Sequence, residues 1–504
     1  MSLYVEQLAA RLAMLRQTVC IVEGDRSIPA SMLLEATYRY ARALESLGIS
    51  KGDVVALLAP NRWEALAVRY AANLLGAGAT FLSVLSEEEQ RMALLAIIKP
   101  ALLVVFPETR HLVLAGESLS IVLAGTSSDD GVPSLDERAA AFSAAHFESR
   151  ARPGDLAVIS SSGGSTGIPK GSRRNFASYT AMVDVPSPLD RRQLINGPLA
   201  NLSQVLADVT LIGGGTIVFQ PHYDAAETLA AIASQRITDF FLVEPQLFEL
   251  MDHPSLPATD LSSLRTLTHI GASAPPTLRL RARERFGPIT VHAYGASEEG
   301  LVSMLQADEH DLAFPKRFAS AGRVLPGVEL RLRKRDGSIA REGEVGAIEV
   351  RSPAMAEGYR NRPDLEAQAF IEGWYRSGDL GYRDTEQYLH ILGRADDFEP
   401  GATPITPTMV EDTLCRTASV RYVSILVDRE YRRWYAFVIP WPDRPVDIAA
   451  CELALKKAYG TPFTSKVVVL CCHAIPLTSQ GKPDRETMLK IAHANIEFGM
   501  SHAF

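Results

Sequence analysis

The sequence is poor in cysteine and has no excess of basic charge. It holds five cysteines among 504 residues: Cys20, Cys415, Cys451, Cys471 and Cys472. They are few and odd in number and show no metal-ligand spacing, so we expect buried thiols in a reducing, cytoplasmic setting. The net charge of −8 provides no basic surface for nucleic acid.

Long apolar runs are also missing. The first eleven residues, MSLYVEQLAAR, lack the basic region followed by an apolar core that a signal peptide needs. Residues 205–219 form the most apolar stretch, but Asp208 and the three glycines at 213–215 interrupt it. No run reaches the length of a bilayer span, so we expect no membrane-spanning segment.

The length and the alternating patterns predict an α/β protein with more than one domain. A chain of 504 residues exceeds the roughly 250–300 residues at which a single core stops growing. Between residues 30 and 300, strand and helix patterns alternate, which is typical of a mainly parallel sheet with helices on both faces. We expect strands at 53–58, 79–84, 101–106, 156–159, 215–219, 239–242, 264–270 and 290–293, and helices at 31–47, 62–76, 225–234 and 245–251.

The pattern changes towards the C-terminus. From about residue 318, short strand patterns joined by Gly and Asp turns predict a small antiparallel unit or barrel. Residues 396–504 predict a compact α+β segment with its own strands at 422–427 and 435–439.

Residues 160–171, SSSGGSTGIPKG, follow a strand pattern and carry the strongest chemical signal. The glycines let backbone N–H groups converge on one point, while Ser165, Thr166 and Lys170 add hydroxyl donors and a positive charge. This pattern predicts a loop that holds a polyphosphate. It is not a Walker A motif, because that motif has glycine directly before its lysine, whereas Pro169 directly precedes Lys170. A flexible Gly/Ser linker is the competing interpretation.

Four more motifs follow in order: residues 294–298 (YGASE), 374–379 (WYRSGD), 393–396 (GRAD) and 476–485 (PLTSQGKPDR). With the Ser/Gly loop, they make the chain resemble the adenylate-forming superfamily of acyl-CoA synthetases, luciferases and peptide-synthetase adenylation domains. The resemblance covers essentially the whole chain.

The resemblance implies a large N-terminal domain, residues 1–395, of parallel-rich sheets with a small β unit. A small mobile α+β domain, residues 396–504, would follow it, with Asp396 as the hinge. In such a family the small domain turns to exchange one active face for another between two half-reactions.

The resemblance further implies ATP, Mg²⁺ and coenzyme A as cofactors. A carboxylate attacks the α-phosphate of ATP and pyrophosphate leaves, so catalysis is mostly positioning and charge stabilisation. The catalytic residues would be Lys482, Thr166 and Glu298. Lys482 would bridge the carboxylate and the α-phosphate, and Glu298 would also bind Mg²⁺ through its hard oxygen atoms.

The other motif residues would hold the nucleotide. Asp379 would accept hydrogen bonds from the ribose with Arg394 beside it, and Tyr294 would stack near the adenine. Residues 271–274 would form the wall between adenine and acyl group, and the Ser/Gly loop would hold the β- and γ-phosphates. The full nucleotide-binding set is Ser162, Gly163, Gly164, Ser165, Thr166, Gly167, Lys170, Gly271, Ala272, Ser273, Ala274, Tyr294, Gly295, Ala296, Ser297, Asp379 and Arg394.

Each motif residue also has an ordinary interpretation when taken alone. Glu298, like Glu299 beside it, would be a surface carboxylate, and Asp379 would be a turn residue. Arg394 would form a weak surface ion pair and Lys482 would be an exposed lysine. None of these interpretations explains the shared order and spacing.

Three departures from the family pattern bear on the substrates. Gly163 stands where the phosphate loop usually has Ser or Thr, and residues 397–407 replace the usual sequence of the loop at the thiol entrance. The segment 198–201 (PLAN) lacks the usual aromatic residue and histidine. Asn201 and Leu202 would therefore line an acyl pocket for an unusual or bulky acid.

An amino-acid substrate would need a carboxylate to pair with its ammonium group. Leu202 and Ser203 stand where that carboxylate is expected, and Asp208 lies too far along the chain. We therefore expect a carboxylic acid without an amino group. No carrier-protein domain follows residue 504, so we expect coenzyme A rather than a carrier protein as the acceptor.

The sequence thus predicts an AMP-forming acyl-CoA synthetase, a cytoplasmic carboxylic acid–thiol ligase that is a monomer or homodimer. One alternative is a half-reaction enzyme that only thioesterifies a preformed acyl-adenylate or only adenylates for a carrier protein. Another is a catalytically silent nucleotide- or acyl-binding protein. A protein that only binds would not require all of the predicted site residues Lys482, Glu298, Asp379 and Arg394. Their joint presence therefore argues against the catalytically silent alternative.

Overall fold

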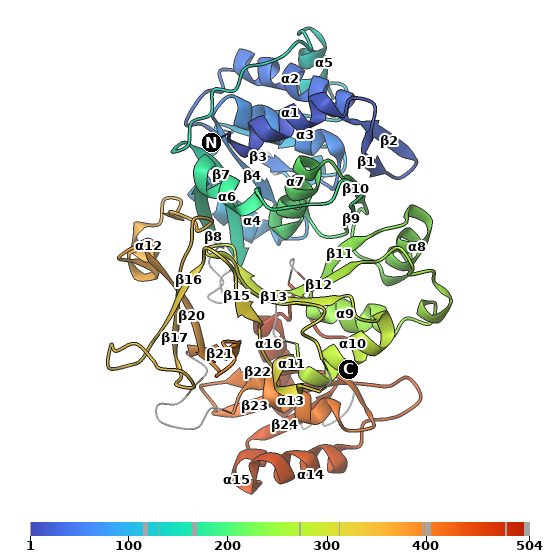
Figure 1. Ribbon diagram of the computed structural model, residues 1–504, viewed down its shortest axis with the longest axis vertical. Helices are drawn as coiled ribbons and strands as arrows, with labels where there is room; N and C mark the ends of the chain where they lie inside the picture. Colours follow the sequence, from blue (N-terminus) through green and yellow to red (C-terminus); the bar gives the residue numbers. More distant parts are fainter. Residues whose placement is uncertain are drawn as a thin grey trace.

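Two large, mainly parallel sheets form the body of the protein (Figure 1). The computed structural model describes residues 2–113, 119–129, 131–163, 169–271, 274–311, 313–395, 398, 405–478 and 481–497. The first sheet has seven strands in the order β18 (Gly358–Tyr359), β8 (Pro169–Asn175), β7 (Leu156–Gly163), β4 (Gly78–Leu82), β3 (Val54–Leu58), β5 (Leu102–Val105) and β6 (Ile121–Leu123).

The second sheet has nine strands and takes in the start of the chain. Its order is β15 (Arg323–Val324), β14 (Gly300–Leu305), β13 (Thr290–Ala296), β12 (Thr266–Ile270), β11 (Asp239–Leu242), β9 (Arg192–Ile195), β10 (Thr216–Phe219), β1 (Val19–Glu23) and β2 (Arg26–Pro29). Strands β1, β10, β9, β11, β12 and β13 pair in parallel. The carboxyl ends of these parallel strands therefore meet at one edge of the sheet, where ligands bind in open α/β sheets.

Helices fill the space between the sheets and cover their outer faces. A single apolar core joins the inner faces of both sheets to α1 (Tyr4–Met14), α2 (Ala30–Ser46), α3 (Trp63–Leu74), α6 (Phe176–Val183) and α7 (Gln204–Gly213). The outer face of the first sheet packs on α4 (Glu88–Ile98). The outer face of the second packs on α8 (Ala225–Gln235), α9 (Glu244–Met251) and α10 (Pro276–Phe286). Every residue of β3 is buried, as a continuous apolar run in a parallel sheet requires.

Two smaller sheets complete the chain. The antiparallel unit predicted after residue 318 is a five-stranded sheet: β16 (Glu329–Arg333), β17 (Gly346–Arg351), β20 (Trp374–Arg383) and β19 (Phe370–Ile371) in that order, with β21 (Leu389–Arg394) on β20. The last sheet is β22 (Val420–Asp428), β23 (Arg433–Pro440) and β24 (Val467–Cys471). Its helices are α13 (Pro407–Cys415), α14 (Ile448–Tyr459), α15 (Thr461–Thr464) and α16 (Arg485–Glu497), and the shorter α5 (Leu135–Ala140), α11 (Pro315–Phe318) and α12 (Pro363–Ala369) lie earlier in the chain.

The C-terminal sheet packs on the helices that cover the outer face of the second large sheet (Figure 1). One apolar core contains Phe248 of α9 together with Tyr422 of β22, and these two rings stack with their centroids 4.1 Å apart. Residues 405–497 are therefore seated against α9 and α10. The division at residue 396 remains a prediction, since Asp396 lies outside the described residues.

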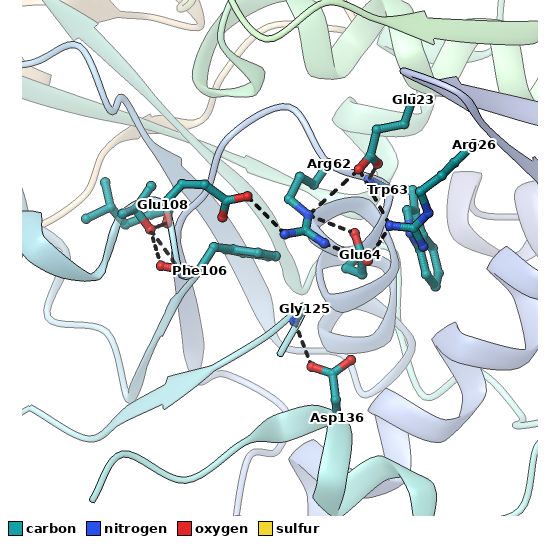
Figure 2. Close-up of polar contacts among 11 residues, drawn as sticks. Glu23, Arg26, Arg62, Trp63, Glu64, Phe106, Glu108, Gly125 and Asp136 are labelled. Atoms are coloured by element: carbon teal, nitrogen blue, oxygen red, sulfur yellow. Dashed lines mark hydrogen bonds and ion pairs between the residues drawn. The ribbon is translucent and has the colours of Figure 1, made fainter. Parts of the chain in front are cut away.

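A charged cluster ties the N-terminal hairpin to the first sheet. Figure 2 shows Arg62, just before α3, between the carboxylates of Glu64 and Glu108, with Glu23 of β1 close by. The Trp63 backbone N–H donates to Glu23 Oε2 over 3.0 Å, and Arg26 lies 3.7 Å from Glu64. These contacts fix the two large sheets to each other at the start of α3.

The fold class is confirmed: a mixed α/β protein of several sheets with a small C-terminal α+β unit. No helix in the described part of the chain is both long and apolar enough to cross a membrane. The cysteines are free thiols, and four of them are buried as predicted. Cys471 corrects that prediction, because it is half-buried at the end of β24.

Candidate active site

The Ser/Gly loop connects two strands of the first sheet. Strands β7 and β8 pair in antiparallel fashion, with Ser162 opposite Lys170 and Gly163 opposite Pro169. The predicted phosphate-loop sequence therefore begins in β7 and ends in β8. Gly164, Ser165, Thr166 and Gly167 lie outside the described residues.

Glu298 lies in the turn that joins β13 to β14, and it is buried rather than exposed. Its relative exposure is 6 %, and Tyr359 Oη donates to its Oε1 over 3.1 Å. The Lys170 ammonium lies 5.6 Å from the centre of the Tyr359 ring, in the range of a cation–π contact. The phosphate-loop lysine and the predicted metal ligand thus contact the same tyrosine, one at its ring and the other at its hydroxyl.

Arg174 of β8 stabilises the turn that carries Glu298. Its Nη1 donates to the carbonyl of Ser297 over 2.6 Å and its Nε to the carbonyl of Ala354 over 2.8 Å. Burial lowers the pKa of Arg174 to about 10, with Glu298 acting in the opposite direction, so the guanidinium remains charged at neutral pH. Arg174 is a positioning residue for Glu298.

Asp379, Arg394 and Tyr294 form a second group at the same edge. Strand register places Asp379 of β20 opposite Arg394 of β21, with Oδ1 and Nη1 3.5 Å apart. Tyr294 Oη donates to Asp379 Oδ2 over 2.7 Å. Burial, helped by the nearby carboxylates of Glu299 and Asp379, raises the pKa of Tyr294 well above its ordinary value, so the phenol stays protonated.

Lys482 reaches this site from the C-terminal segment. A Cβ atom on Gly271, where φ is +99°, would lie 3.1 Å from Lys482 Cε, so the lysine passes directly over that glycine. The turn that carries Lys482 is closed by the Thr478 N–H, which donates to the Lys482 carbonyl over 2.8 Å. A side chain at residue 271 would obstruct the lysine, which explains the glycine.

Opposite charges surround the Lys482 ammonium. Burial lowers its pKa, the Arg394 guanidinium lowers it further, and the carboxylates of Glu298 and Asp379 act in the opposite direction. Two cations and two carboxylates are therefore close together near β13, β20, β21 and the Lys482 turn. Such a region can bind an anion and stabilise negative charge that develops on it.

The predicted acyl-pocket segment forms an irregular π-helical turn, Leu199–Ser203, a form often found at functional sites. The Ser203 hydroxyl donates to the carbonyl of Gly197 over 2.9 Å, and a Cβ atom on Gly197 would lie 3.2 Å from Phe241 Cζ. An aromatic ring of β11 thus packs against this segment. The side chain of Asn201 is outside the described set, and Leu202 is half-buried.

Asp208 cannot serve as the missing substrate carboxylate. Its carboxylate accepts hydrogen bonds from the phenols of Tyr70 and Tyr179, both over 2.6 Å, and lies 2.8 Å from Arg69 Nη1. All of these groups are buried. The carboxylate of Asp208 therefore pairs with buried groups of the core and is not available to a substrate.

Most of the predicted site residues that the structure describes gather at this edge. Gly271, Tyr294, Glu298, Asp379, Arg394 and Lys482 come together there, while Ala272, Ser273 and Asp396 lie outside the described residues. Gly295, Ala296 and Ser297 lead into the Glu298 turn, and the Ala274 carbonyl accepts from Arg279 Nε. Two of the ordinary interpretations are wrong, because Glu298 and Lys482 are not exposed.

Sequence reasoning missed Tyr359, Arg174 and the burial of Glu299. Glu299 is 1 % exposed, and neither carboxyl oxygen has a hydrogen-bond partner among the described residues. Burial and the neighbouring Asp379 and Glu298 raise its pKa well above the ordinary value. The consecutive glutamates at 298 and 299 were the only signal that could have identified it.

The arrangement defines a nucleotide-binding, adenylate-forming class of enzyme, and comparison with known proteins agrees. Residues 8–360 match the family model described as AMP-binding enzyme. A medium/long-chain-fatty-acid–CoA ligase of Mycobacterium tuberculosis is 31% identical over 92% of this chain and 86% of its own length. The chain belongs to the family of AMP-binding enzymes.

Solved structures resemble the whole chain. The amide bond synthetase McbA of Marinactinospora thermotolerans superimposes with a TM-score of 0.85 at 28% identity, covering 96% of this chain and 99% of its own. ATP-bound MatB of Rhodopseudomonas palustris superimposes with a TM-score of 0.84 at 23% identity, covering 98% of this chain and 100% of its own. At that identity, the second comparison bears on the fold alone.

Proposed function

We propose that the protein activates a carboxylic acid with ATP and transfers the acyl group to coenzyme A. The observation that carries this proposal is the position of Lys482, which lies over Gly271 within the electrostatic reach of Glu298, Asp379 and Arg394. Binding alone would not need a lysine brought from a separate segment into a region already furnished with charge.

In the first half-reaction, an oxygen of the substrate carboxylate attacks the α-phosphorus of ATP and pyrophosphate leaves with the bonding electrons. Lys482 donates hydrogen bonds to the carboxylate and to the α-phosphate, which brings two anions together. Asp379 accepts hydrogen bonds from the ribose hydroxyls, and Arg394 keeps that carboxylate oriented. Holding reactants in this way contributes much of the rate enhancement of phosphoryl-type transfers.

Glu298 fits the role of a magnesium ligand. It offers a buried carboxylate oxygen that accepts a hydrogen bond from Tyr359, whose ring also contacts Lys170. No set of three or more potential ligand side chains gathers among the described residues, so any protein contribution there comes from few groups. Mg²⁺ is suited to this, since it binds one or two carboxylates together with phosphates and water. When bound, Mg²⁺ would neutralise charge on the phosphates.

In the second half-reaction, the thiol sulfur attacks the acyl carbonyl carbon and AMP leaves, with the thiol proton released. The relative that is a fatty-acid–CoA ligase supports coenzyme A as the acceptor. Phe241 beside the π-helical turn and the occupied Asp208 support an apolar acid without an amino group.

A second candidate acceptor is an amine, which would give an amide. The whole-chain similarity to an amide bond synthetase favours it, as does the unusual sequence of residues 397–407. The first half-reaction and its residues are the same in both cases.

The test is release of pyrophosphate from ATP and Mg²⁺ across aliphatic, aromatic and polycyclic acids, with coenzyme A, an amine or neither. Acid-dependent release with an acyl-CoA product is the expected result. An amide product instead would establish the second candidate. Thioester formed only from a supplied acyl-adenylate would show a half-reaction enzyme, and no reaction in any arm would overturn the proposal.

A further inference from the structure

The position of Lys482 depends on how residues 405–497 are seated on α9 and α10. The Lys482 turn contacts the residue just before α9: a Cβ atom on Gly481 would lie 3.0 Å from Val243 Cγ2. The next residue, Glu244, begins α9 and faces the C-terminal segment. Glu244 is therefore the sequence neighbour of Val243, the residue that contacts the Lys482 turn. A change in the contacts of Glu244 can be passed to that turn through Val243.

A second buried carboxyl, that of Glu411, lies close enough to Glu244 for its negative charge to raise the pKa of Glu244. Glu411 of α13 accepts a hydrogen bond from the Ile425 backbone N–H over 2.9 Å, and both glutamates are buried. Oε1 of Glu244 has no hydrogen-bond partner among the residues that the structure describes. Placing two carboxyls together in a dry interface is unfavourable when both are ionised.

Two of the cations near the pair, Arg279 and Arg281, have other hydrogen-bond partners. The Arg279 guanidinium donates to the carbonyls of Ala274 and Ser320, over 3.0 and 2.6 Å. Arg281 is bonded to Asp252 by two 2.7 Å hydrogen bonds. No ion pair joins Glu244 or Glu411 to a cation within the described ranges. The charged and titratable groups that face the pair are Arg279, Arg281, Asp412, Cys415, Tyr422 and Arg485.

Behind Arg279 lies a group of buried histidines that adds no competing charge. His269 and His292 approach to 2.7 Å between their Nδ1 atoms, so one donates and the other accepts. Burial lowers the pKa of His269 to about 3 and that of His310 to about 4. All three rings are neutral near neutral pH, so they do not supply the charge that the carboxyl pair lacks.

We propose that the Glu244–Glu411 pair makes the seating of the C-terminal segment, and with it the placement of Lys482, dependent on a proton held between the two domains. The seated arrangement holds the proton, and separation of β22 and α13 from α9 exposes both carboxyls to water and releases it. The proposal uses the proposed function only in assigning Lys482 to adenylation.

The direction of the pH effect follows from linkage. Burial raises the pKa of both carboxyls in the seated state, to about 7 for Glu411, and the negative charge of Glu411 raises that of Glu244 further. Hydrated glutamates have a pKa of about 4.3. The stabilisation of the seated state is therefore fully present at low pH and is lost as pH rises through the raised pKa. Adenylation is favoured below neutral pH, and the step that needs the other arrangement is favoured above it.

Hydrogen exchange of the ligand-free full chain tests this directly, because the Ile425 amide is bonded to Glu411. Protection factors of residues 244–251 and 420–428, corrected for intrinsic exchange, are measured from pH 6 to 9. We expect a fall of about tenfold per pH unit for each proton released once the pair titrates. The double variant Glu244→Gln/Glu411→Gln should show no such fall.

Glu452→Gln on the exposed face of α14 is the matched control and should behave like the wild type. Exchange of β3 and β4 reports whether the variants are folded, and the two single variants stand in if the double variant is not. A flat wild-type profile, or an equally steep double variant, would overturn the proposal. Absent pyrophosphate release with an intact exchange profile would instead count against the proposed function.

Discussion

At the scale of single residues, the site depends on a few groups whose burial the motifs do not reveal. The sequence predicted Lys482, Glu298 and Asp379 from the order and spacing of their motifs. It could not predict that Glu299 is more buried than Glu298, because two adjacent glutamates in a turn look equally exposed. Tyr359 was missed for a related reason: its contact with Glu298 joins segments that are distant in the sequence.

Lys482→Ala should reduce acid-dependent pyrophosphate release by at least about 100-fold, because the two reacting anions lose their shared donor. Thioester formation from a supplied acyl-adenylate should continue. Lys490→Ala is the control, since that lysine is 73 % exposed and forms a surface ion pair with Glu486. Adenylation that survives in Lys482→Ala would remove the lysine from the mechanism.

Asp379→Asn should raise the KM for ATP about tenfold, which corresponds to roughly 1.4 kcal/mol of lost binding. The change preserves shape but removes the charge that orients Arg394 and accepts from Tyr294. Steady-state kinetics at saturating acid measures it, with the exposed Asp364→Asn as the control. An unchanged KM would show that the ribose is held elsewhere.

At the scale of elements, continuous apolar runs located the strands well. Residues 239–242 are a strand with the predicted limits, because the run is mostly apolar. The hairpin β1–β2 was missed, since its stability comes from β10, which lies far along the chain. The π-helical turn at Leu199–Ser203 was also missed, because it depends on packing against β4 and β7.

The contact between α9, α10 and β22 is another element that no local pattern predicts. Asp252, 3 % exposed at the end of α9, accepts from Arg281 of α10 and from Arg421 of β22. Removing one member of a buried ionic group costs about 3–5 kcal/mol. Asp252→Ala should therefore loosen the seating of β22.

Hydrogen exchange of residues 420–428 checks this, and protection should fall at least about tenfold in Asp252→Ala. Asp443→Asn is the matched control, because its side chain is 73 % exposed. Unchanged protection in Asp252→Ala would mean that apolar packing around Tyr422 and Phe248 holds the interface without the ion pairs.

At the scale of the whole molecule, the fold class and the order of its parts followed from the alternation of patterns along the chain. What the sequence could not give is the seating of the last hundred or so residues, since it depends on contacts between segments far apart. The predicted hinge, Asp396, is the residue about which that seating would change.

Asp396→Pro should restrict backbone rotation at the hinge, because proline fixes φ near −65°. Pyrophosphate release should be retained to within about threefold, whereas thioester or amide formation should fall at least about tenfold. Separate assays of the two half-reactions measure this, with Asp443→Pro as a control for proline outside the hinge. Equal losses in both assays would count against Asp396 as the pivot.

The pairing of β1 with β10 has a consequence for how the chain is made. Ile21 lies opposite Ile217, so the start of the chain must wait for a strand synthesised much later before it enters a sheet. Contacts of such long sequence separation form slowly, and unpaired strand edges are prone to misassociate in the meantime. A newly made chain would therefore depend on early folding of α1 and α2, which would cover the β1–β2 hairpin until β10 is available to pair with it. Additions at the N-terminus should affect the yield of folded protein more than its catalysis.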